Sequence, residues 1–570
     1  MKTDLIIKNG KILSKNVREL YSTAIAVAGG KITYVGNDKD AMKYASENTK
    51  VIDARQNTVI PGMCDAHVHV SFTTELCHGA NIFYIAREVG EPRKDYIDRL
   101  LFNVKTFADK HPEKPSIMGV GWSPADFLND SEGLPTCKEL DRACSDRPVL
   151  LKSYCHHYIW ANSMAIEMSG ICKETPVEAG CMIFRDKEGN PNGVFQEFQA
   201  MNMLQKSFDI ADFSVKEYKD GILSYQNDYA IKNGITCAFD PILNTRSLQA
   251  YRELATENKL EIRINAAVLA DPTAPLSQFD SWIEEKGKYD IDDRFKVNTF
   301  KFFFDGSGLE FYLLKPFEKE LLDFNGLPTD YKGHEIWPLE KAKQAFLKIA
   351  KAGFNIHIHA MGDGAVKEAI DAFEYVHEQG VDLRKQRNTI THLMFISDED
   401  IKRMSSLGII AAMQPHWGVY ETFADAYMIP HFGIDRTNRF YPTGKLLKEN
   451  VICSTSTDFP VIPFYTIIPN MQSSITRSVL KSAYDYEKYK NHIDPHPEYR
   501  ITLEELIQCS TYNGAHQLNF EDAAGTIEVG KSADIVIFDC NLQEIPTDKI
   551  ENASISYMIV RGQLKQSTIK

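Results

Sequence analysis

The stretch Ile60-Pro61-Gly62-Met63-Cys64-Asp65-Ala66-His67-Val68-His69-Val70 decides how the rest of the chain is interpreted. The turn residues Pro61 and Gly62 precede a run that alternates with period two, which predicts a strand. His67 and His69 are then two residues apart, so both imidazoles project from one face. Two converging neutral imidazoles suit a divalent transition metal, but two ligands never fill a zinc shell. Because a polar strand face with two hydrogen-bonded histidines is the alternative, the missing ligands must be sought elsewhere in the chain.

Length and composition describe a globular protein built from several structural units. With 570 residues the chain is too long for one compact core, and we expect about two to four units. Hydrophobic residues at 43% and charged residues at 25% are ordinary for a soluble enzyme. The net charge of -14 argues against a nucleic-acid binder and against a polybasic membrane-surface protein.

The N-terminal segment and the cysteines indicate a cellular location. The first apolar run is too short for a signal peptide, and no stretch approaches the ~20 apolar residues that span a bilayer. We therefore expect a cytoplasmic protein with no membrane partner. The 11 cysteines include no Cys-x-x-Cys pair, so we interpret them as reduced thiols that serve mainly in packing.

Short strand patterns separated by glycine turns occupy both ends of the chain. Near the N-terminus they predict two hairpins, at 5–13 and 24–35, and similar strands recur within 533–560. Each end alone is too small to form a good core. We therefore expect residues 1–58 and 525–570 to pack together as one β-sandwich.

Between these ends, strand-like apolar runs alternate with helical patterns, which is typical of parallel β/α units. Together with the histidine segment there are eight such runs, the others being 234–240, 262–268, 298–305, 354–360, 388–392, 409–413 and 451–458. Eight is the number that closes a (β/α)8 barrel. We predict an α/β fold in which 59–524 form a TIM-type barrel, with helices around 342–352 and 366–379. Because the chain after the first barrel strand is far longer than one unit needs, we expect 75–215 to be an insertion over the barrel mouth.

The ends of the predicted barrel strands carry the candidate site. In such barrels the chemistry lies at the C-terminal strand ends. There the sequence places His67, His69, Lys301, His359, His392 and Asp458. Any one of these residues alone is ordinary, but all six at the ends of the right strands predict a metal centre. His357 shares a strand face with His359, so geometry leaves either one as the ligand.

The order of the motifs resembles that of the amidohydrolase superfamily and, within it, the YtcJ-like branch that includes N-substituted formamide deformylase. The matching stretches cover nearly the whole chain: Pro61-Gly62-Met63-Cys64-Asp65-Ala66-His67-Val68-His69, Lys301-Phe302-Phe303-Phe304-Asp305-Gly306-Ser307, His359-Ala360-Met361-Gly362-Asp363-Gly364-Ala365, Thr391-His392-Leu393, Gln414-Pro415-His416, Ser456-Thr457-Asp458-Phe459-Pro460 and Gly525-Thr526-Ile527 with Gly530-Lys531-Ser532-Ala533-Asp534. Within the insertion the match continues with His157, Asn162-Ser163 and Gly193-Val194-Phe195-Gln196-Glu197.

The resemblance implies a set of metal ligands. His67 and His69 would bind the more buried ion together with Asp458, and a second ion would be bound by His359 and His392. The His-Ala-x-Gly-Asp match favours His359 as the ligand and leaves His357 a supporting role. The expected cofactor is a divalent metal, with zinc the first candidate, although such ligands also accept Mn, Fe, Co or Ni.

Lys301 would bridge the two metals after its amine is carboxylated by CO2, as the resemblance implies. Only a neutral amine attacks CO2, and burial among apolar neighbours lowers a lysine pKa. Phe300, Phe302, Phe303 and Phe304 surround Lys301 in the sequence. Alternatively Lys301 pairs with Asp305 or with a substrate carboxylate. In that case the site would hold one metal, and Glu197 would be a possible substitute ligand.

The predicted activity is hydrolysis of a C–N bond in a linear amide, such as an N-acyl or N-formyl amine, by metal-activated hydroxide. Asp458 would take a proton from the nucleophile and pass it to the leaving nitrogen. His157, Glu197 and His416 are the candidate substrate-binding residues, and the second metal or one of these histidines would stabilise the oxyanion.

Other activities on the same barrel remain as alternatives to the linear-amide hydrolase. A cyclic-amide hydrolase would use the same ligands, and a deaminase usually works with one metal and no bridging lysine. A non-enzymatic binding protein would be expected to lose ligands, and none is lost here. The expected partner is a small-molecule amide rather than a nucleic acid, and barrels of this kind often form homodimers.

Overall fold

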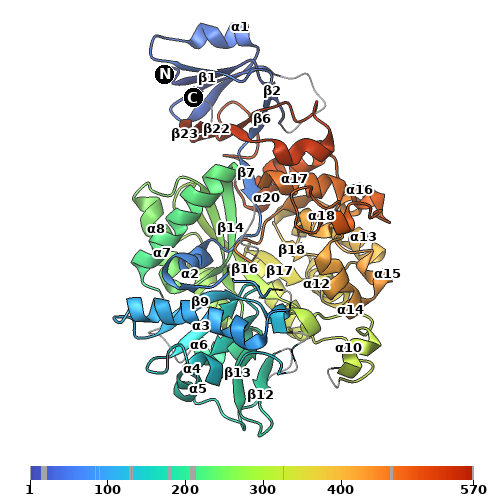
Figure 1. Ribbon diagram of the computed structural model, residues 1–570. Helices are drawn as coiled ribbons and strands as arrows, with labels where there is room; N and C mark the ends of the chain where they lie inside the picture. Colours follow the sequence, from blue (N-terminus) through green and yellow to red (C-terminus); the bar gives the residue numbers. More distant parts are fainter. Residues whose placement is uncertain are drawn as a thin grey trace.

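The computed structural model describes residues 2–14, 22–83, 85–88, 90–127, 130, 132–177, 181–205, 213–324, 327–461 and 467–567. Three parts follow one another along the long axis of the molecule (Figure 1). Strands from both chain ends lie at one extremity, a barrel of strands surrounded by helices occupies the middle, and the segment that follows the first barrel strand lies at the other extremity.

Eight parallel strands form the central sheet, and each pairs with the next one along the chain. They are β7 (Met63–Asp65), β14 (Ile235–Leu243), β15 (Arg263–Leu269), β16 (Phe295–Phe303), β17 (Asn355–Ala360), β18 (Thr389–His392), β19 (Ile410–Met413) and β20 (Cys453–Thr455). The first and last strands meet because the amide of Ala66 donates to the carbonyl of Thr455 at 3.0 Å. The sheet therefore closes as the predicted TIM-type (β/α)8 barrel.

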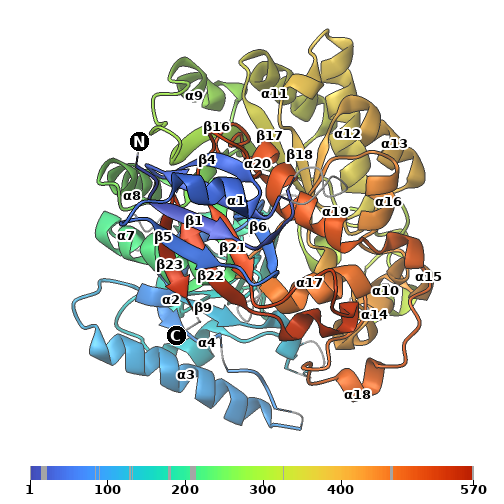
Figure 2. The same ribbon diagram turned by 90° about the horizontal axis from the view of Figure 1, so that it is seen from above.

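Helices cover the outside of this barrel and form a ring in the view down its axis (Figure 2). The helices within 215–524 are α7 (Val215–Ser224), α8 (Thr245–Thr256), α9 (Asp280–Glu284), α10 (Lys319–Phe324), α11 (Leu339–Lys351), α12 (Asp363–Glu378), α13 (Asp398–Leu407), α14 (Ile429–Phe432), α15 (Ile434–Thr437), α16 (Thr443–Lys448), α17 (Ile467–Thr476), α18 (Tyr486–Tyr489), α19 (Leu503–Gln508) and α20 (Gly514–Gln517). The two helices predicted from the sequence are confirmed as α11 and α12. Within the described residues, no helix is both long and apolar enough to cross a membrane.

Successive residues of a barrel strand point alternately towards the apolar layer under the helices and towards the barrel interior, where the functional side chains lie. All six residues of β17 are buried, because the helices cover one face of the strand and the barrel interior encloses the other. Ile356 and Ile358 belong to the apolar layer under the helices, whereas His357 and His359 contact other histidines inside the barrel. The period of two in this strand therefore sorts the core residues from the functional residues.

Two small sheets made from both chain ends form the terminal sandwich. One has the order β4-β3-β1-β5 and the other β2-β6-β21-β22-β23. Their strands are β1 (Leu5–Lys8), β2 (Lys11–Ile12), β3 (Ala24–Ala28), β4 (Lys31–Gly36), β5 (Lys50–Asp53), β6 (Thr58–Pro61), β21 (Ile535–Phe538), β22 (Ile555–Val560) and β23 (Gln563–Ser567), with α1 (Asp38–Ala41) outside them. Isoleucines of both ends, such as Ile7, Ile25, Ile535 and Ile559, share one core. The sandwich thus combines segments that neither end could stabilise alone.

Two details of this sandwich differ from the sequence prediction. The hairpin at 24–35 forms as β3 and β4, but the hairpin at 5–13 is wrong, because β1 and β2 lie in different sheets. Asn9, with φ of 58°, turns the chain from one sheet into the other. In addition, β6 pairs with β21 at Ile60 and Val59, so residues 59–61, which the sequence analysis assigns to the barrel, belong to the terminal sheet.

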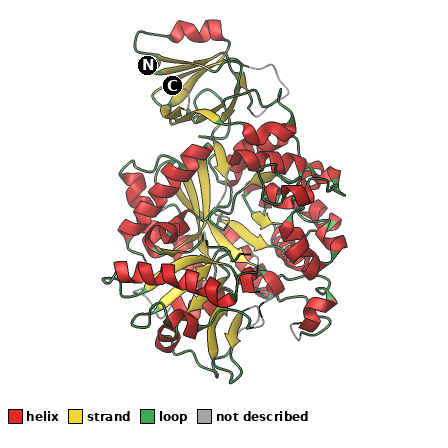
Figure 3. Cartoon of the chain, in the orientation of Figure 1, coloured by secondary structure: helices red, strands yellow, loops and turns green. Residues whose placement is uncertain are grey.

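The segment between β7 and β14 carries a sheet of its own on the side of the barrel away from the termini (Figures 1 and 3). Its six strands have the order β12-β13-β11-β10-β9-β8. The elements are β8 (Ala80–Asn81), β9 (Ile117–Trp122), β10 (Val149–Ser153), β11 (Tyr158–Ala161), β12 (Met182–Arg185) and β13 (Pro191–Gln196), with α2 (Thr73–His78), α3 (Arg93–Lys110), α4 (Cys137–Asp141), α5 (Ser163–Met168) and α6 (Phe198–Gln205). This inserted layer covers the carboxyl ends of the barrel strands.

Candidate metal centre

The alternation predicts that His67 and His69 belong to a strand, and this is wrong. Both residues lie just beyond the end of β7. The chain leaves the sheet there because the amide of Val68 donates to Phe239 O at 2.9 Å and that of His69 to Phe459 O at 2.8 Å. Both imidazoles still reach one point. The Nε2 atom of each is 3.3 Å from Oδ1 of Asp458.

His357 holds His67 from behind. The two rings are parallel, with an interplanar angle of 3° and centroids 4.9 Å apart, and Nδ1 of His67 lies 2.8 Å from Nε2 of His357. One of these nitrogens must donate to the other. If Nδ1 of His67 carries the proton, its Nε2 lone pair faces Asp458, which is the tautomer that a metal requires. The supporting position expected for His357 matches this contact.

His392 is held in the same way by an amide. Its Nδ1 lies 3.0 Å from the Oε1 of Gln414, and the Nε2 of Gln414 donates to Ser456 Oγ at 2.6 Å. A carbonyl oxygen can only accept, so Nδ1 of His392 donates and Nε2 keeps its lone pair. Burial lowers the pKa of His392 to about 4, so the ring is neutral at pH 7 and able to bind a cation.

Asp458 turns its carboxylate into the barrel through an uncommon backbone conformation. Its φ is 58°, and that of His392 is 75°; such left-handed non-glycine residues cost energy and cluster at functional sites. Asp65 fixes the turn by accepting from both the amide and the hydroxyl of Thr457, at 2.9 and 2.5 Å. Burial raises the pKa of Asp458, but His69 and the positive charge of neighbouring groups outweigh it, so that pKa lies below its usual range.

Lys301 enters the barrel from β16 without an ordinary partner. Its side chain is fully buried and Nζ makes no hydrogen bond, while the ring of Phe303 lies 4.7 Å from it. The neighbours Phe300 and Phe302 point the other way and pack against Phe279. Burial lowers the pKa of Lys301 to about 7, so a large fraction of the amine is neutral near physiological pH.

His359 is the second imidazole of β17 that faces the interior. Its ring centroid lies 4.7 Å from that of His392, and its Nε2, 3.5 Å from Asp305, makes no hydrogen bond. Asp305 is occupied by backbone donors, since it accepts from the amides of Met361 and Gly362 at 3.0 and 2.7 Å. His359 is therefore held among polar groups with a nitrogen that makes no hydrogen bond to any described residue.

These side chains fit a divalent metal. Ligand atoms of His67, His392 and Asp458 lie within 4.8 Å of one another, and all three residues are buried. Two ligands of a tetrahedral ion at ~2.1 Å stand about 3.4 Å apart, which matches the 3.3 Å between each of the His67 and His69 nitrogens and Asp458. Asp458 Oδ1 also makes no hydrogen bond. Buried polar atoms without partners are expensive unless a ligand satisfies them.

The inserted layer brings two further predicted residues to this centre. Nδ1 of His157 lies 2.9 Å from Oε2 of Glu197, and the amide of Ser307 donates to Oε1 of Glu197 at 3.0 Å. A side chain at Gly306 would come within 2.5 Å of that carboxylate, so the glycine after β16 makes room for it. The ring centroid of His157 is 5.6 Å from that of His359. Glu197 thus supports His157 and does not take a place in the His67, His392 and Asp458 cluster.

His416 and Trp417 stand beside His392 at the edge of the site. The Trp417 ring is nearly parallel to that of His392, with centroids 5.8 Å apart, and His416 contacts Trp417 edge-on. Burial lowers the pKa of His416 to about 3, so it is neutral at ordinary pH. His416 and Trp417 line a cavity of about 2670 Å³ together with the six predicted metal ligands, His157 and Glu197.

A comparison with known families decides the identity of this arrangement. The model of the amidohydrolase family matches residues 50–564, which is most of the chain. The chain belongs to the amidohydrolase family. It is therefore a hydrolase, and the resemblance found in its motifs is confirmed.

Two curated relatives extend over almost the same length as this amidohydrolase. N-substituted formamide deformylase from Arthrobacter pascens is 24% identical over 99% of this chain and 98% of its own. The putative amidohydrolase YtcJ of Bacillus subtilis is 23% identical, with 95% of each chain covered. Among solved structures, an uncharacterized metal-dependent hydrolase from Pyrococcus horikoshii OT3 has a TM-score of 0.70 at 21% identity, with 95% of this chain and 99% of that chain covered. This structure supports the fold of the amidohydrolase.

Several supporting residues of this amidohydrolase site were missed by the sequence analysis. Gln414 was quoted within a motif without a role, Asp305 was considered only as a partner of Lys301, which makes no hydrogen bond to it, and Asp65 was not singled out at all. Their position inside matched motifs was the available signal, because a residue that aligns a ligand stands close to it in the sequence. The contacts across the barrel, such as that of Asp65 with Thr457, had no local signal.

Proposed function

We propose that this amidohydrolase cleaves the C–N bond of a linear amide, an N-acyl or N-formyl amine, at a metal centre built from His67, His69, His359, His392, Lys301 and Asp458. The observation that carries the proposal is the group of buried polar atoms without partners: Lys301 Nζ, His359 Nε2 and Asp458 Oδ1. Such atoms need a ligand from outside the protein, and their identities match a divalent cation bound by nitrogen and carboxylate.

A divalent metal held there would lower the pKa of a coordinated water towards ~7 and polarise the substrate carbonyl. Asp458 supplies the acid–base step. Its carboxylate, whose pKa lies below its usual range, accepts the proton of the attacking water and delivers it to the leaving nitrogen. Asp65 and Thr457 keep that carboxylate in place, so the group that moves the proton is aligned before substrate arrives.

Lys301 is proposed to act as an anionic residue that would help to hold the metal. Its neutral amine attacks CO2, one N–C bond forms and one proton is released, which leaves a carbamate. The pKa of about 7 that burial gives this amine supports the first step, and the absence of a hydrogen-bond partner on Nζ supports the need for a further group. His392, which lies beside both His67 and His359, is positioned to bind either ion.

His157 is the proposed stabiliser of the carbonyl oxygen as it becomes an oxyanion. Burial lowers the pKa of His157, but the carboxylate of Glu197 outweighs this and raises that pKa above the usual value. When it is protonated, an imidazole that donates to Glu197 from Nδ1 also presents Nε2 as a donor. His416, whose neutral ring stands by Trp417, is assigned to substrate contact and not to charge stabilisation.

The activity named for the Arthrobacter relative supports the choice of a linear amide. That protein is a deformylase of N-substituted formamides by its name, and it matches this chain from end to end at 24% identity. Cyclic amides and exocyclic amines of nucleobases are the competing substrates of this family. Two metal ions per chain would favour the amidase over a deaminase, since the bridging lysine has no role with one ion.

The test is the Asp458→Asn variant, assayed after metal analysis of the purified protein and reloading with the metal found. We expect a loss of turnover of about 10²–10⁴ on N-acyl amines, because the group that moves the proton is gone, with metal still bound. Asp126→Asn is the matched control. Asp126 is another carboxylate that lines the cavity, but it accepts from Tyr96 and belongs to the inserted layer. Full activity of Asp458→Asn would refute the mechanism.

A further inference from the structure

We propose that the substrate carries a large, uncharged, apolar group, so that the natural amide is an N-alkyl, N-aryl or long-chain acyl compound and not an N-acyl amino acid. This inference rests on the proposed amidase function and names its substrate class. It is carried by three features of the cavity that contains the metal centre: its size, its apolar walls with a partly apolar rim, and the pairing of its cations.

The cavity is much larger than the chemistry requires. Its volume is about 2670 Å³, whereas pockets for drug-sized ligands are ~300–1,000 Å³. The same space is bounded by His67, His359 and Asp458 at its floor and by the inserted layer on its far side. A formyl or acetyl group with a small amine would leave most of it filled with water, so the space is suited to a larger group attached to the amide.

Apolar side chains from several elements form the walls. The inserted layer contributes Phe127, Leu134, Met182 and Phe184, and the segments after the barrel strands contribute Leu309, Phe311, Ile336 and Met361. Burial of apolar surface against such walls stabilises a complex in proportion to the area removed from water. The walls therefore favour a hydrocarbon or aromatic substituent over a polar one.

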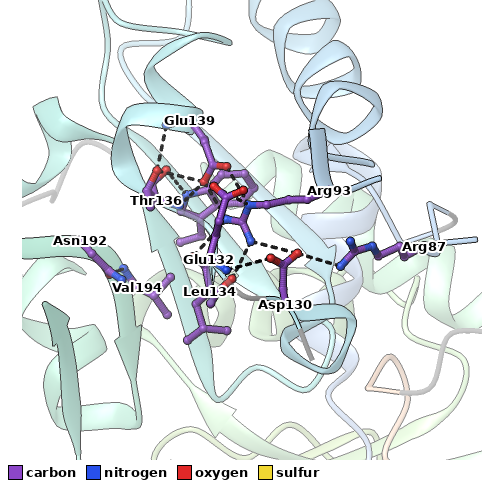
Figure 4. Close-up of polar contacts among 11 residues, drawn as sticks. Arg87, Arg93, Asp130, Glu132, Leu134, Thr136, Glu139, Asn192 and Val194 are labelled. Carbon is purple, nitrogen blue, oxygen red and sulfur yellow. Dashed lines mark hydrogen bonds and ion pairs between the residues drawn. The ribbon is translucent and has the colours of Figure 1, made fainter. Parts of the chain in front are cut away.

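The wall formed by the inserted layer is held firmly in place. Arg93 donates to the carbonyl oxygens of Gly133 and Leu134 at 2.6 and 3.3 Å and also pairs with Glu139 (Figure 4). Asp130, on the same side of the cavity, is held by Arg87 at 3.0 Å (Figure 4). Because Leu134 is fixed by its own backbone, this wall is a preformed surface for a substituent.

Part of the rim of the cavity is apolar. Phe423, Ile434 and Tyr484 line it while 47%, 48% and 90% of their surfaces remain exposed, and the other exposed lining residues include Glu132, Glu320 and Glu421. Large exposed apolar side chains mark a binding surface for an apolar partner. Here the surface is continuous with the metal centre, so its occupant is the apolar part of the amide that reacts there.

Apart from Lys301, the lysines and arginines among the described lining residues of the cavity already donate to groups of the protein. Four lysines and arginines stand among the lining residues, and one of them, Lys301, belongs to the metal centre. Lys152 donates to Glu75 at 2.5 Å, and Arg185 donates to the carbonyls of Cys172, Gly189 and Thr175. Arg246 donates to Phe213 O at 3.5 Å. A buried anion without a partner is strongly disfavoured, so an N-acyl amino acid would bind poorly.

The first experiment varies the length of the apolar group while the amide that is cleaved stays the same. N-butyl-, N-octyl- and N-dodecylacetamide form one series, and the N-methylamides of butanoic, octanoic and dodecanoic acid form the other. In at least one series we expect kcat/KM to rise by about three- to fourfold for each added methylene until the cavity is filled. N-dodecanoylglycine should react at least about tenfold more slowly than the N-methylamide of dodecanoic acid, because its carboxylate finds no free cation.

The second experiment separates this inference from the proposed reaction. Binding of the same compounds to metal-loaded Asp458→Asn is measured by calorimetry, without any need for turnover. Tighter binding of the longer compounds without hydrolysis by the wild-type enzyme would overturn the reaction and support the substrate class. Hydrolysis and binding that are both independent of length, or a preference for N-dodecanoylglycine, would overturn the substrate class and leave the reaction intact.

A matched pair of variants locates the effect in the cavity. Phe423→Asp places a charge on the rim, and Phe102→Asp places one on α3, where Phe102 is 70% exposed and lies away from the cavity. We expect Phe423→Asp to lower kcat/KM for N-dodecylacetamide by about tenfold and to affect N-butylacetamide much less, with no effect of Phe102→Asp on either compound. Equal effects of the two variants would contradict the role of the rim.

Discussion

Two buried clusters of charged residues stand at opposite ends of the same barrel, and they differ in one respect. At the end next to the terminal sandwich, Arg263 is completely buried and donates to Asp534 and Asp293 through its three nitrogens. Asp534 uses its other oxygen to accept from the amide of Arg561 at 2.7 Å. At the mouth, Lys301, His359 and Asp458 are equally buried, but each has a polar atom without a hydrogen-bond partner.

This contrast indicates that the first cluster stabilises the fold and that the second binds a ligand. A buried charge is tolerated when its hydrogen bonds are satisfied within the protein. Arg263 and Asp534 meet that condition while they join β15 to the terminal sheet. The mouth cluster does not meet it. Burying these unpaired polar atoms at the mouth costs free energy that only a bound group can offset. The following predictions test the different roles of the two clusters.

The largest effect on stability is expected at the Arg263 cluster. Asp534→Ala leaves the buried guanidinium of Arg263 without its closest partner, and breaking a buried pair in this way costs about 3–5 kcal/mol of unfolding free energy. Asp548→Ala is the control, because Asp548 pairs with Lys481 at the surface and exposed pairs contribute about 0–1 kcal/mol. Urea unfolding measures both. Activity per folded molecule should be unchanged in Asp534→Ala. If this variant stayed folded but lost activity, the Arg263 cluster would have a role beyond stabilising the fold.

A pH-dependent effect of nearly the same size is expected at the mouth. The folded pKa of Lys301 is about 7, whereas an unfolded lysine has a pKa of about 10.4. Between these values the unfolded state binds more protons, so the unfolding free energy rises with pH. In metal-free protein, wild type should therefore gain up to about 4 kcal/mol over Lys301→Met between pH 7 and 10.5, and Lys301→Met should be the more stable at pH 7.

Urea unfolding at several pH values, with metal removed, measures this difference. Lys296→Met is the matched control, since Lys296 belongs to the same strand but donates to Asn519 O at 2.7 Å. Curves for wild type and Lys301→Met that stay parallel from pH 7 to 10.5 would show that the amine is charged in the folded protein. The premise for its reaction with CO2 would then be lost.

The sequence predicted the barrel well because the evidence for it was local and repeated. In β17 the alternation of isoleucine with histidine gives both the strand and its two faces, and each of the eight runs carries its own signal. The hairpin at 5–13 failed because nothing in the sequence says that the turn at Asn9 leads into a second sheet. Which strands pair in the sandwich depends on partners more than 470 residues away, as in the pairing of Ile535 with Pro61.

For the site, the sequence predicted the residues better than their support. His67, His392 and Asp458 were named because metal ligands must be histidines and carboxylates at strand ends. The contacts of His67 with His357 and of Asp65 with Thr457 could not be predicted, because they depend on the closed barrel and on left-handed backbone at His392 and Asp458. Sequence patterns carry no signal for the order in which strand ends face one another across the interior.

The smallest effect expected, at Gln414, tests whether the mouth is arranged for metal. Its amide oxygen accepts from Nδ1 of His392, and losing such an outer partner weakens metal binding by about 10–100-fold. Gln414→Leu should therefore show that loss in a competition titration with a chelator. Gln226→Leu also removes a buried amide, one that donates to Lys259 O on the outside of the barrel, and should bind metal as the wild type does. If Gln414→Leu retained full metal affinity, His392 would be held for packing and not for coordination, and the unpartnered atoms at the mouth would need another ligand.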